Sequence, residues 1–177
     1  NVLEGKNNSV WAVNKLYKKE LFDNVRYPVG KYAEDAFVII KILMQCEKVV
    51  FTTQKKYYYI RRNSSITTNG FNKKSYDFLE AQIKNRDLIE KKYPNLMDVA
   101  QFRVCLSYFS ILDKMILANA KIDKSVVKDL RNNFKFILVN NNFAITRKIA
   151  MILLMLNVNL YKIVCKIFYK KERQLFD

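Results

Sequence analysis

The 177-residue sequence contains no histidine. This absence excludes Ser/His and Cys/His nucleophile pairs, and it excludes every metal site that depends on an imidazole ligand. Any side chain that acts as an acid or a base must therefore be a carboxylate, a lysine or a tyrosine.

Glycine and proline are scarce, with three and two residues respectively. So few turn-forming residues favour helices joined by short polar connections over a many-stranded sandwich. The three cysteines, Cys46, Cys105 and Cys165, are odd in number and lie in apolar runs. They are typical of core residues in a reduced, cytoplasmic protein, and they support neither a disulfide framework nor a Cys-x-x-Cys metal clip.

The sequence also has no secretory signal and no long apolar run. The stretch "IAMILLML", residues 149–156, has eight apolar residues, well short of the roughly 20 that span a bilayer. The chain begins at Asn1 without methionine or a charged and apolar leader, so we expect it to be part of a longer protein.

Positive charge is abundant, with 32 Lys and Arg against 16 Asp and Glu and a net charge of +16. An anionic partner is one explanation: nucleic acid, a membrane surface or a phosphorylated substrate. A solvated coat is the other, because the richness in Lys, Asn, Ile, Tyr and Phe is typical of an AT-rich coding sequence. Residues 130–171 contain no acidic side chain, which a general coding bias explains poorly.

The first third of the chain has a mixed pattern. Residues 9–13 and 48–60 are rich in β-branched and aromatic side chains and predict strands. Leu16, Leu21 and Phe22 could face a core if a helical turn begins after Tyr17, and Pro28 and Gly30 indicate a loop. Residues 36–44 are apolar on all sides and predict a buried helix.

After Gly70 the apolar spacing becomes helical. It predicts a helix of about five turns that ends before Pro94, a second over 100–115, and a third over 126–137 behind an Asp123 cap. The last forty residues predict two more helices. The fold class is therefore mainly α with a small mixed α/β part, divided into residues 1–68 and a helical domain of residues 69–177.

The adjacent acids Glu34 and Asp35 precede the buried helix. Side chains at i and i+1 of a helix point about 100° apart, so the pair cannot flank one bond as the carboxylates of a glycosidase do. One acid can face a substrate, or both can simply complement the helix dipole. The dipole lowers the pKa of a carboxyl group, whereas burial raises it.

The surroundings of this pair resemble the second half of the catalytic domain of bacterial family 2 glycosyltransferases of the capsular and exopolysaccharide type. The shared elements occur in one order over residues 9–68: Asn14-Lys15-Leu16-Tyr17, Leu21-Phe22, Arg26-Tyr27-Pro28, Gly30-Lys31, Glu34-Asp35, Tyr57 to Tyr59, Arg62 and Ser65-Ile66. The resemblance implies the acceptor-side portion of a GT-A domain, followed here by a helical C-terminal domain.

The resemblance also implies roles for individual residues. Asp35 would be the general base that takes the proton of an acceptor hydroxyl while a sugar is transferred, with inversion, from a nucleotide-sugar to a glycan or lipid-linked acceptor in cell-surface polysaccharide synthesis. Glu34 would shape the acceptor pocket or cap the helix. Arg62, Arg61, Lys15 and Tyr17 would bind substrate, although loop arginines are often only solvated and Lys15 could equally form an ion pair.

In that family a D-x-D motif in the preceding half holds a divalent metal, Mg or Mn. The present sequence has no D-x-D motif, so the metal and the nucleotide pocket are expected in a preceding part of a full-length enzyme, and the fragment alone is expected to be inactive.

The last predicted helix places Lys162, Lys166, Lys170 and Arg173 on one stripe. Leu160, Ile163, Val164, Ile167 and Phe168 lie on the opposite side, so the helix is basic and amphipathic. It could dock on the inner face of a membrane as part of a peripheral protein, or it could be a bundle helix with a solvated basic face. An alternative for the whole chain is a basic helical nucleic-acid-binding or membrane-surface module, but no RNP, zinc-finger or basic-zipper pattern supports nucleic acid.

Overall fold

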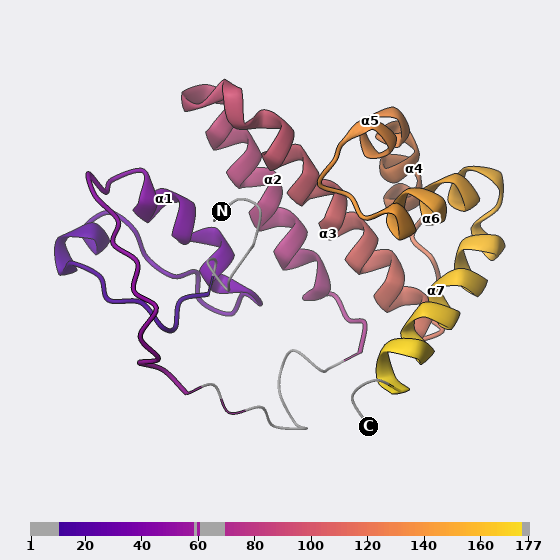
Figure 1. Cartoon of the computed structure of the whole chain (residues 1–177), viewed down its shortest axis with the longest axis horizontal. Coiled ribbons are helices and arrows are strands. Elements are labelled where there is room, and N and C mark those ends of the chain that lie inside the picture. Colours follow the sequence, from indigo (N-terminus) through magenta and orange to yellow (C-terminus); the bar gives the residue numbers. More distant parts are fainter. Residues whose placement is uncertain (1–10, 59, 61–69, 175–177) are drawn as a thin grey trace.

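The computed structural model describes residues 11–58, 60 and 70–174, and the side chains up to residue 168. Figure 1 shows an irregular N-terminal part beside a bundle of helices. The elements in chain order are the 3-10 helices and α-helices η2 (Lys19–Phe22), η3 (Glu34–Phe37), α1 (Ile39–Leu43), α2 (Ser75–Lys92), η5 (Pro94–Leu96), α3 (Met97–Leu117), α4 (Lys124–Asn132), α5 (Phe134–Val139), α6 (Ile145–Leu156) and α7 (Val158–Gln174).

The mainly α prediction is confirmed, but the described residues contain no strand. Both strand predictions are therefore wrong where they can be compared, over 11–13, over 48–58 and at Ile60. Ser9, Val10 and Tyr59 lie outside the described residues. The segment after α1 leaves Val49, Val50 and Phe51 exposed. A strand forms only when a neighbour takes its backbone hydrogen bonds, and no neighbouring strand is present in the described chain. The small mixed α/β part is thus not observed, and the GT-A relationship stays a prediction.

The helix predictions are largely confirmed. The buried helix is found as η3 followed by α1, and α2 ends at Lys92, two residues before Pro94. The expected third helix is two helices, α4 and α5, separated at Asn133. The Asp123 cap is present, because its Oδ1 accepts the Ser125 N–H at 2.8 Å.

Helix α3 is the centre of the larger core. Cys105, Phe109 and Leu112 on α3 have no exposed surface, and they pack with side chains from α4, α6 and α7. The same cluster contains Leu79 of α2, whereas Ala81 of α2 belongs to the core of the N-terminal part with Phe37 and Ile42. Helix α2 therefore belongs to both cores, and Figure 1 shows it between α1 and α3. The division at residue 68 stays a prediction.

The three cysteines are free thiols with different surroundings. Cys105 and Cys165 are buried in the larger core. Cys46 is only partly buried, packs against the N-terminal core, and donates its S–H to the Ile42 carbonyl at 3.3 Å.

Helix α7 buries only part of its apolar surface. Its buried side chains are Tyr161 and Cys165, which do not belong to the apolar side described in the sequence as opposite the lysines. Four of its five members, Leu160, Ile163, Ile167 and Phe168, are exposed. Among the described residues, no helix combines the length and the apolar character needed to cross a bilayer.

Candidate active site around Asp35

The acid pair occupies the first two positions of η3. Ala33 precedes it with φ of +54°, a left-handed conformation that costs a residue with a Cβ roughly 1–2 kcal/mol. This turn leaves Glu34 exposed and Asp35 partly buried, because the chain from Ala36 to Ile40 enters the core directly afterwards.

The carboxyl group of Asp35 has an unusual environment. Its Oδ1 accepts the N–H of Ala36 at 2.8 Å, which favours the ionised form. Burial acts in the opposite direction and is the larger effect, so the pKa of Asp35 is raised above its ordinary value. Its helix, η3, has only four residues, which limits the dipole that would lower that pKa. A raised pKa makes the carboxylate a better proton acceptor.

Two of the predicted substrate-binding residues lie in the electrostatic neighbourhood of Asp35. Burial lowers the pKa of Lys15, and the charge of Asp35 partly offsets this effect. The Lys15 ammonium also donates to the Trp11 carbonyl at 2.6 Å and to Asn14 Oδ1 at 3.0 Å. Burial raises the pKa of Tyr17 to about 12, with contributions from Tyr27 and Asp35.

Tyr27 is a member of this site that the sequence did not single out. Burial raises its pKa, and the charges of Asp35 and Glu34 act in the same direction. The Phe22 ring lies between the two tyrosines, with centroids 5.5 Å from Tyr17 and 5.9 Å from Tyr27. The sequence signal for Tyr27 is its place in the Arg26-Tyr27-Pro28 element of the resemblance, which gave it no role of its own.

Helix α2 fixes the segment that leads into the acid pair. Asp77 accepts the Tyr32 N–H at 2.9 Å through Oδ2 and the Lys31 ammonium at 2.9 Å through Oδ1. Glu80 accepts from the same ammonium at 2.7 Å. These contacts join residues 45 to 49 positions apart in the sequence, so they set where the acid pair lies relative to the helix.

A buried amide completes this attachment. Asn85 Nδ2 of α2 donates to the Ala36 carbonyl at 2.8 Å, one residue after Asp35. The adjacent Phe37 ring has the ammonium groups of Lys31 and Lys84 within 5.9 and 5.6 Å of its centroid. The backbone that carries Asp35 is therefore held by a buried hydrogen bond and by cations packed on the neighbouring ring.

The remaining predicted site residues are not brought to Asp35 by the described structure. Arg61 and Arg62 lie outside the described residues. Lys162 and Lys166 lie on α7, and nothing is described of the side chains of Lys170 and Arg173. Among the residues that the structure describes, no three Asp, Glu, Cys or His side chains gather as a metal site would require. The expected Mg or Mn site stays a prediction about a longer protein.

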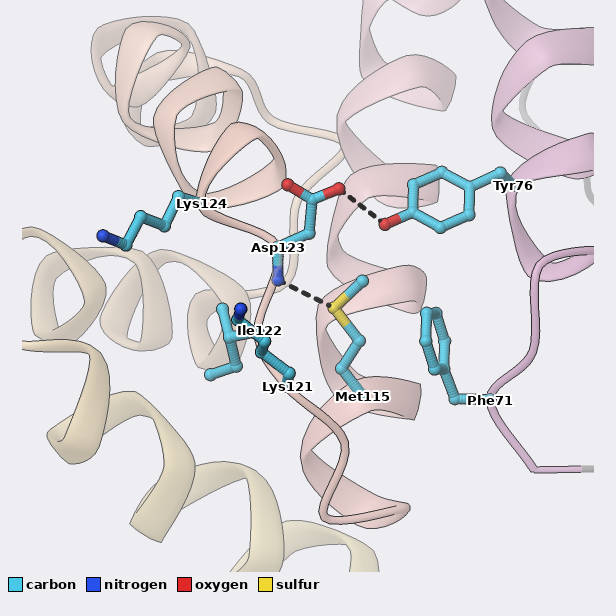
Figure 2. Close-up of a pocket in the computed structure, with 7 residues that line it drawn as sticks. All are labelled: Phe71, Tyr76, Met115, Lys121, Ile122, Asp123 and Lys124. Carbon is cyan, nitrogen blue, oxygen red and sulfur yellow. Dashed lines mark hydrogen bonds between the residues drawn. The ribbon is translucent and has the colours of Figure 1, made fainter.

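A hollow of about 570 Å³ lies elsewhere, between α2, α3 and the start of α4. Figure 2 shows Asp123 at its centre, with a carboxylate oxygen directed at the Tyr76 hydroxyl, which donates at 2.8 Å, and its backbone N–H directed at the Met115 sulfur. Both oxygens of Asp123 are used within the protein, because Oδ1 accepts from Ser125. These bonds explain the residue as a helix cap, so we assign no chemistry to this hollow.

Comparisons with known proteins found similarity to a glycosyltransferase. No family model matches the chain, and no solved structure matches it. It is similar to glycosyltransferase GlyA of Streptococcus pneumoniae serotype 4, with 29% identity over 99 residues. The match covers 55% of this chain and 14% of that protein, so the chain spans a small part of the length of this curated relative. The similarity supports a relationship to glycosyltransferases.

Proposed function

We propose that the chain is the acceptor-side portion of an inverting, family 2-like glycosyltransferase in which Asp35 is the general base. The observation that carries the proposal is the Asp35 carboxyl group: partly buried, raised in pKa, and attached to α2 through the neighbouring Ala36 carbonyl. The similarity to a named glycosyltransferase supports the reaction class, and the order of motifs in residues 9–68 supports the family.

In the proposed reaction, an acceptor hydroxyl gives its proton to the Asp35 carboxylate while its oxygen attacks the anomeric carbon of a nucleotide-sugar. The bond from that carbon to the phosphate oxygen breaks, the nucleotide diphosphate leaves with the electron pair, and the configuration inverts. The nearby Lys15 ammonium favours ionised Asp35 before the attack. Tyr17 and Tyr27 keep their protons at neutral pH, because the ordinary pKa of tyrosine is about 10 and burial raises it further in both, so their hydroxyls can hydrogen-bond the acceptor.

The leaving diphosphate requires neutralisation by a metal or by cations. We assign none of the described residues to a metal, and the proposal places Mg or Mn on a D-x-D motif in a preceding part of the protein. Arg61 and Arg62 are proposed as cations for the diphosphate. The acceptor would be a glycan or lipid-linked glycan of the cell surface, which places the reaction on the cytoplasmic side of the inner membrane.

The experiment is a transfer assay on the longer natural protein that contains this chain. Release of UDP from a panel of UDP-hexoses is measured with membrane glycolipid extract as acceptor. Asp35→Asn keeps the shape and the Ala36 hydrogen bond but cannot accept the proton, and we expect the rate to fall by about 10² to 10⁴. Glu34→Gln is the matched control and is expected to stay within about ten-fold of the unaltered enzyme. A rate that survives Asp35→Asn contradicts the assignment of the base.

A further inference from the structure

The two C-terminal helices expose apolar side chains along their lengths. On α6, Ile145, Ile149, Ile152, Met155 and Leu156 are each between 40% and 71% exposed. On α7, Leu160, Ile163, Ile167 and Phe168 are each between 40% and 60% exposed. We call these nine side chains the outer face. Apolar side chains exposed in this number on two successive helices are typical of a site of interaction.

The outer face follows the helical period. Ile145, Ile149, Ile152 and Leu156 are spaced by four, three and four residues, so they form one row along α6. Leu160, Ile163 and Ile167 form a row along α7 in the same way. Only residues 157–159 separate the rows, and α6 and α7 pack against each other.

Neither row belongs to the core of the bundle. The core side of α6 carries Ala150, Met151 and Leu154, and the core side of α7 carries Tyr161 and Cys165. Each helix is therefore apolar on two sides, one of which is already packed. Figure 1 shows α7 along one edge of the molecule, with no other labelled helix beyond it.

The charged side chains described on α6 and α7 are all basic. Lys148 neighbours Ile152 and Met155 by helical position, and Lys162 and Lys166 flank the row on α7. From Leu130 to Lys171 the sequence has eight basic residues and no acidic one. The Lys166 ammonium reaches a neutral group, Asn119 Oδ1, at 3.1 Å.

We infer that the outer face docks on an anionic lipid surface, with α6 and α7 lying in the interface and their apolar rows inserted among the acyl chains. An apolar row with a lysine flank is the pattern of interfacial helices. A second copy of this chain is disfavoured, because pairing two such faces would bring the lysines of both copies together. Nucleic acid would use the lysines but would leave the isoleucines without a role.

This proposal does not depend on the role of Asp35. It is tested with the 177-residue protein and sedimented vesicles of phosphatidylcholine with about 30% phosphatidylglycerol, compared with phosphatidylcholine alone. We expect binding that requires the anionic lipid. Ile163→Ser combined with Ile167→Ser should weaken it about ten-fold, because serine cannot replace the inserted apolar surface. Val49→Ser combined with Val50→Ser removes exposed apolar surface elsewhere and should leave binding unchanged.

The lysines are examined in the same way. Lys148→Glu combined with Lys166→Glu should weaken binding about ten-fold. The control is Lys55→Glu combined with Lys56→Glu, which changes the net charge by the same amount at exposed positions away from the outer face. The control pair should weaken binding less. Hydrogen exchange of the unaltered protein, which depends on no variant, should slow in residues 145–168 when anionic vesicles are added.

Four results would overturn the inference. The first two are equal binding to both vesicle types and binding that does not change in the Ile163→Ser, Ile167→Ser variant. The third is hydrogen exchange in residues 145–168 that stays the same when vesicles are added. The fourth is a dimer in vesicle-free buffer that the same double variant converts to a monomer. Binding to a 20-nucleotide RNA without binding to vesicles would also overturn it.

Discussion

At the scale of single residues, Asp35 and Asp123 are carboxyl groups whose pKa values move in opposite directions. Burial raises the pKa of Asp35, so the native state favours its protonated form. Hydrogen bonds from Ser125 and Tyr76 lower the pKa of Asp123, so the native state favours its ionised form. The two groups must therefore affect the pH dependence of stability with opposite signs.

Asp35→Asn should change stability in a pH-dependent way. In the unaltered protein, the raised pKa of Asp35 stabilises the fold fully below the pKa that Asp35 has in the unfolded chain, about 3.9. This stabilisation is lost as the pH rises through the pKa of Asp35 in the folded protein. Relative to the unaltered protein, the variant should therefore gain in free energy of unfolding from pH 3.5 to pH 7, measured by urea unfolding.

Asp123→Asn is the control of opposite sign. The lowered pKa of Asp123 stabilises the fold above about pH 3.9, the ordinary pKa of an aspartate. This stabilisation is lost as the pH falls through the pKa of Asp123 in the folded protein. The variant should be less stable than the unaltered protein at pH 7, and the difference should shrink in acid. Parallel pH trends for the two variants would contradict these assignments.

Sequence patterns selected Asp35 as a candidate base, but they did not identify the residues that fix the position of its backbone. The acid pair, Lys15 and Tyr17 lie within one run of about 20 residues, so local motifs were sufficient to select them. Asn85 lies 49 residues from its partner Ala36 and occupies an ordinary helical position. Only the packing of α2 on η3 brings them together, and no local spacing encodes such a contact.

At the scale of elements, the helices were predictable because apolar residues recur with the helical period between clear end signals, such as Pro94 after α2 and Asp123 before α4. The strands were not, because residues 48–58 have strand-forming side chains but no partner strand in the described chain. The sequence left open which side of α7 packs in the core, because both of its sides are apolar and periodicity alone does not decide between them.

Asn85→Ala is expected to loosen the contact between α2 and η3. It removes the donor to a buried carbonyl, which should lower the free energy of unfolding by about 2 kcal/mol. Lys91→Ala at an exposed position on the same helix should stay within about 0.5 kcal/mol. Urea unfolding measures both, and equal effects of the two changes would show that the Asn85 hydrogen bond does not hold η3.

At the scale of the whole molecule, one buried polar network joins α3, α6 and α7. Asp113 of α3 pairs with Arg147 of α6 at 2.7 Å, and it accepts the Tyr161 hydroxyl of α7 at 2.6 Å. Cys165 donates to the same carboxylate at 3.4 Å. Burial and this carboxylate raise the pKa of Tyr161, so its hydroxyl stays protonated and remains a donor.

Asp113→Ala should therefore be strongly destabilising. It leaves the Arg147 guanidinium and the Tyr161 hydroxyl without their acceptor, and we expect a loss of about 3 kcal/mol in the free energy of unfolding. Asp87→Ala removes the exposed pair with Arg86 and should cost less than about 1 kcal/mol. Asp113→Leu combined with Arg147→Met should recover part of the loss, since no charge is then left unpaired. A double variant that is less stable than Asp113→Ala would contradict this account.

The placement of the three thiols gives the molecule a built-in reporter for its two cores. In native buffer only Cys46 should react readily with a water-soluble disulfide reagent, because Cys105 and Cys165 are buried and burial raises the pKa of each to about 12. In increasing urea, Cys105 and Cys165 should become reactive together. The rate of Cys46 should change in the same transition, because α2 supplies residues to both cores. Thiol labelling followed by peptide mass spectrometry would then distinguish one cooperative unit from two separate domains without any substitution.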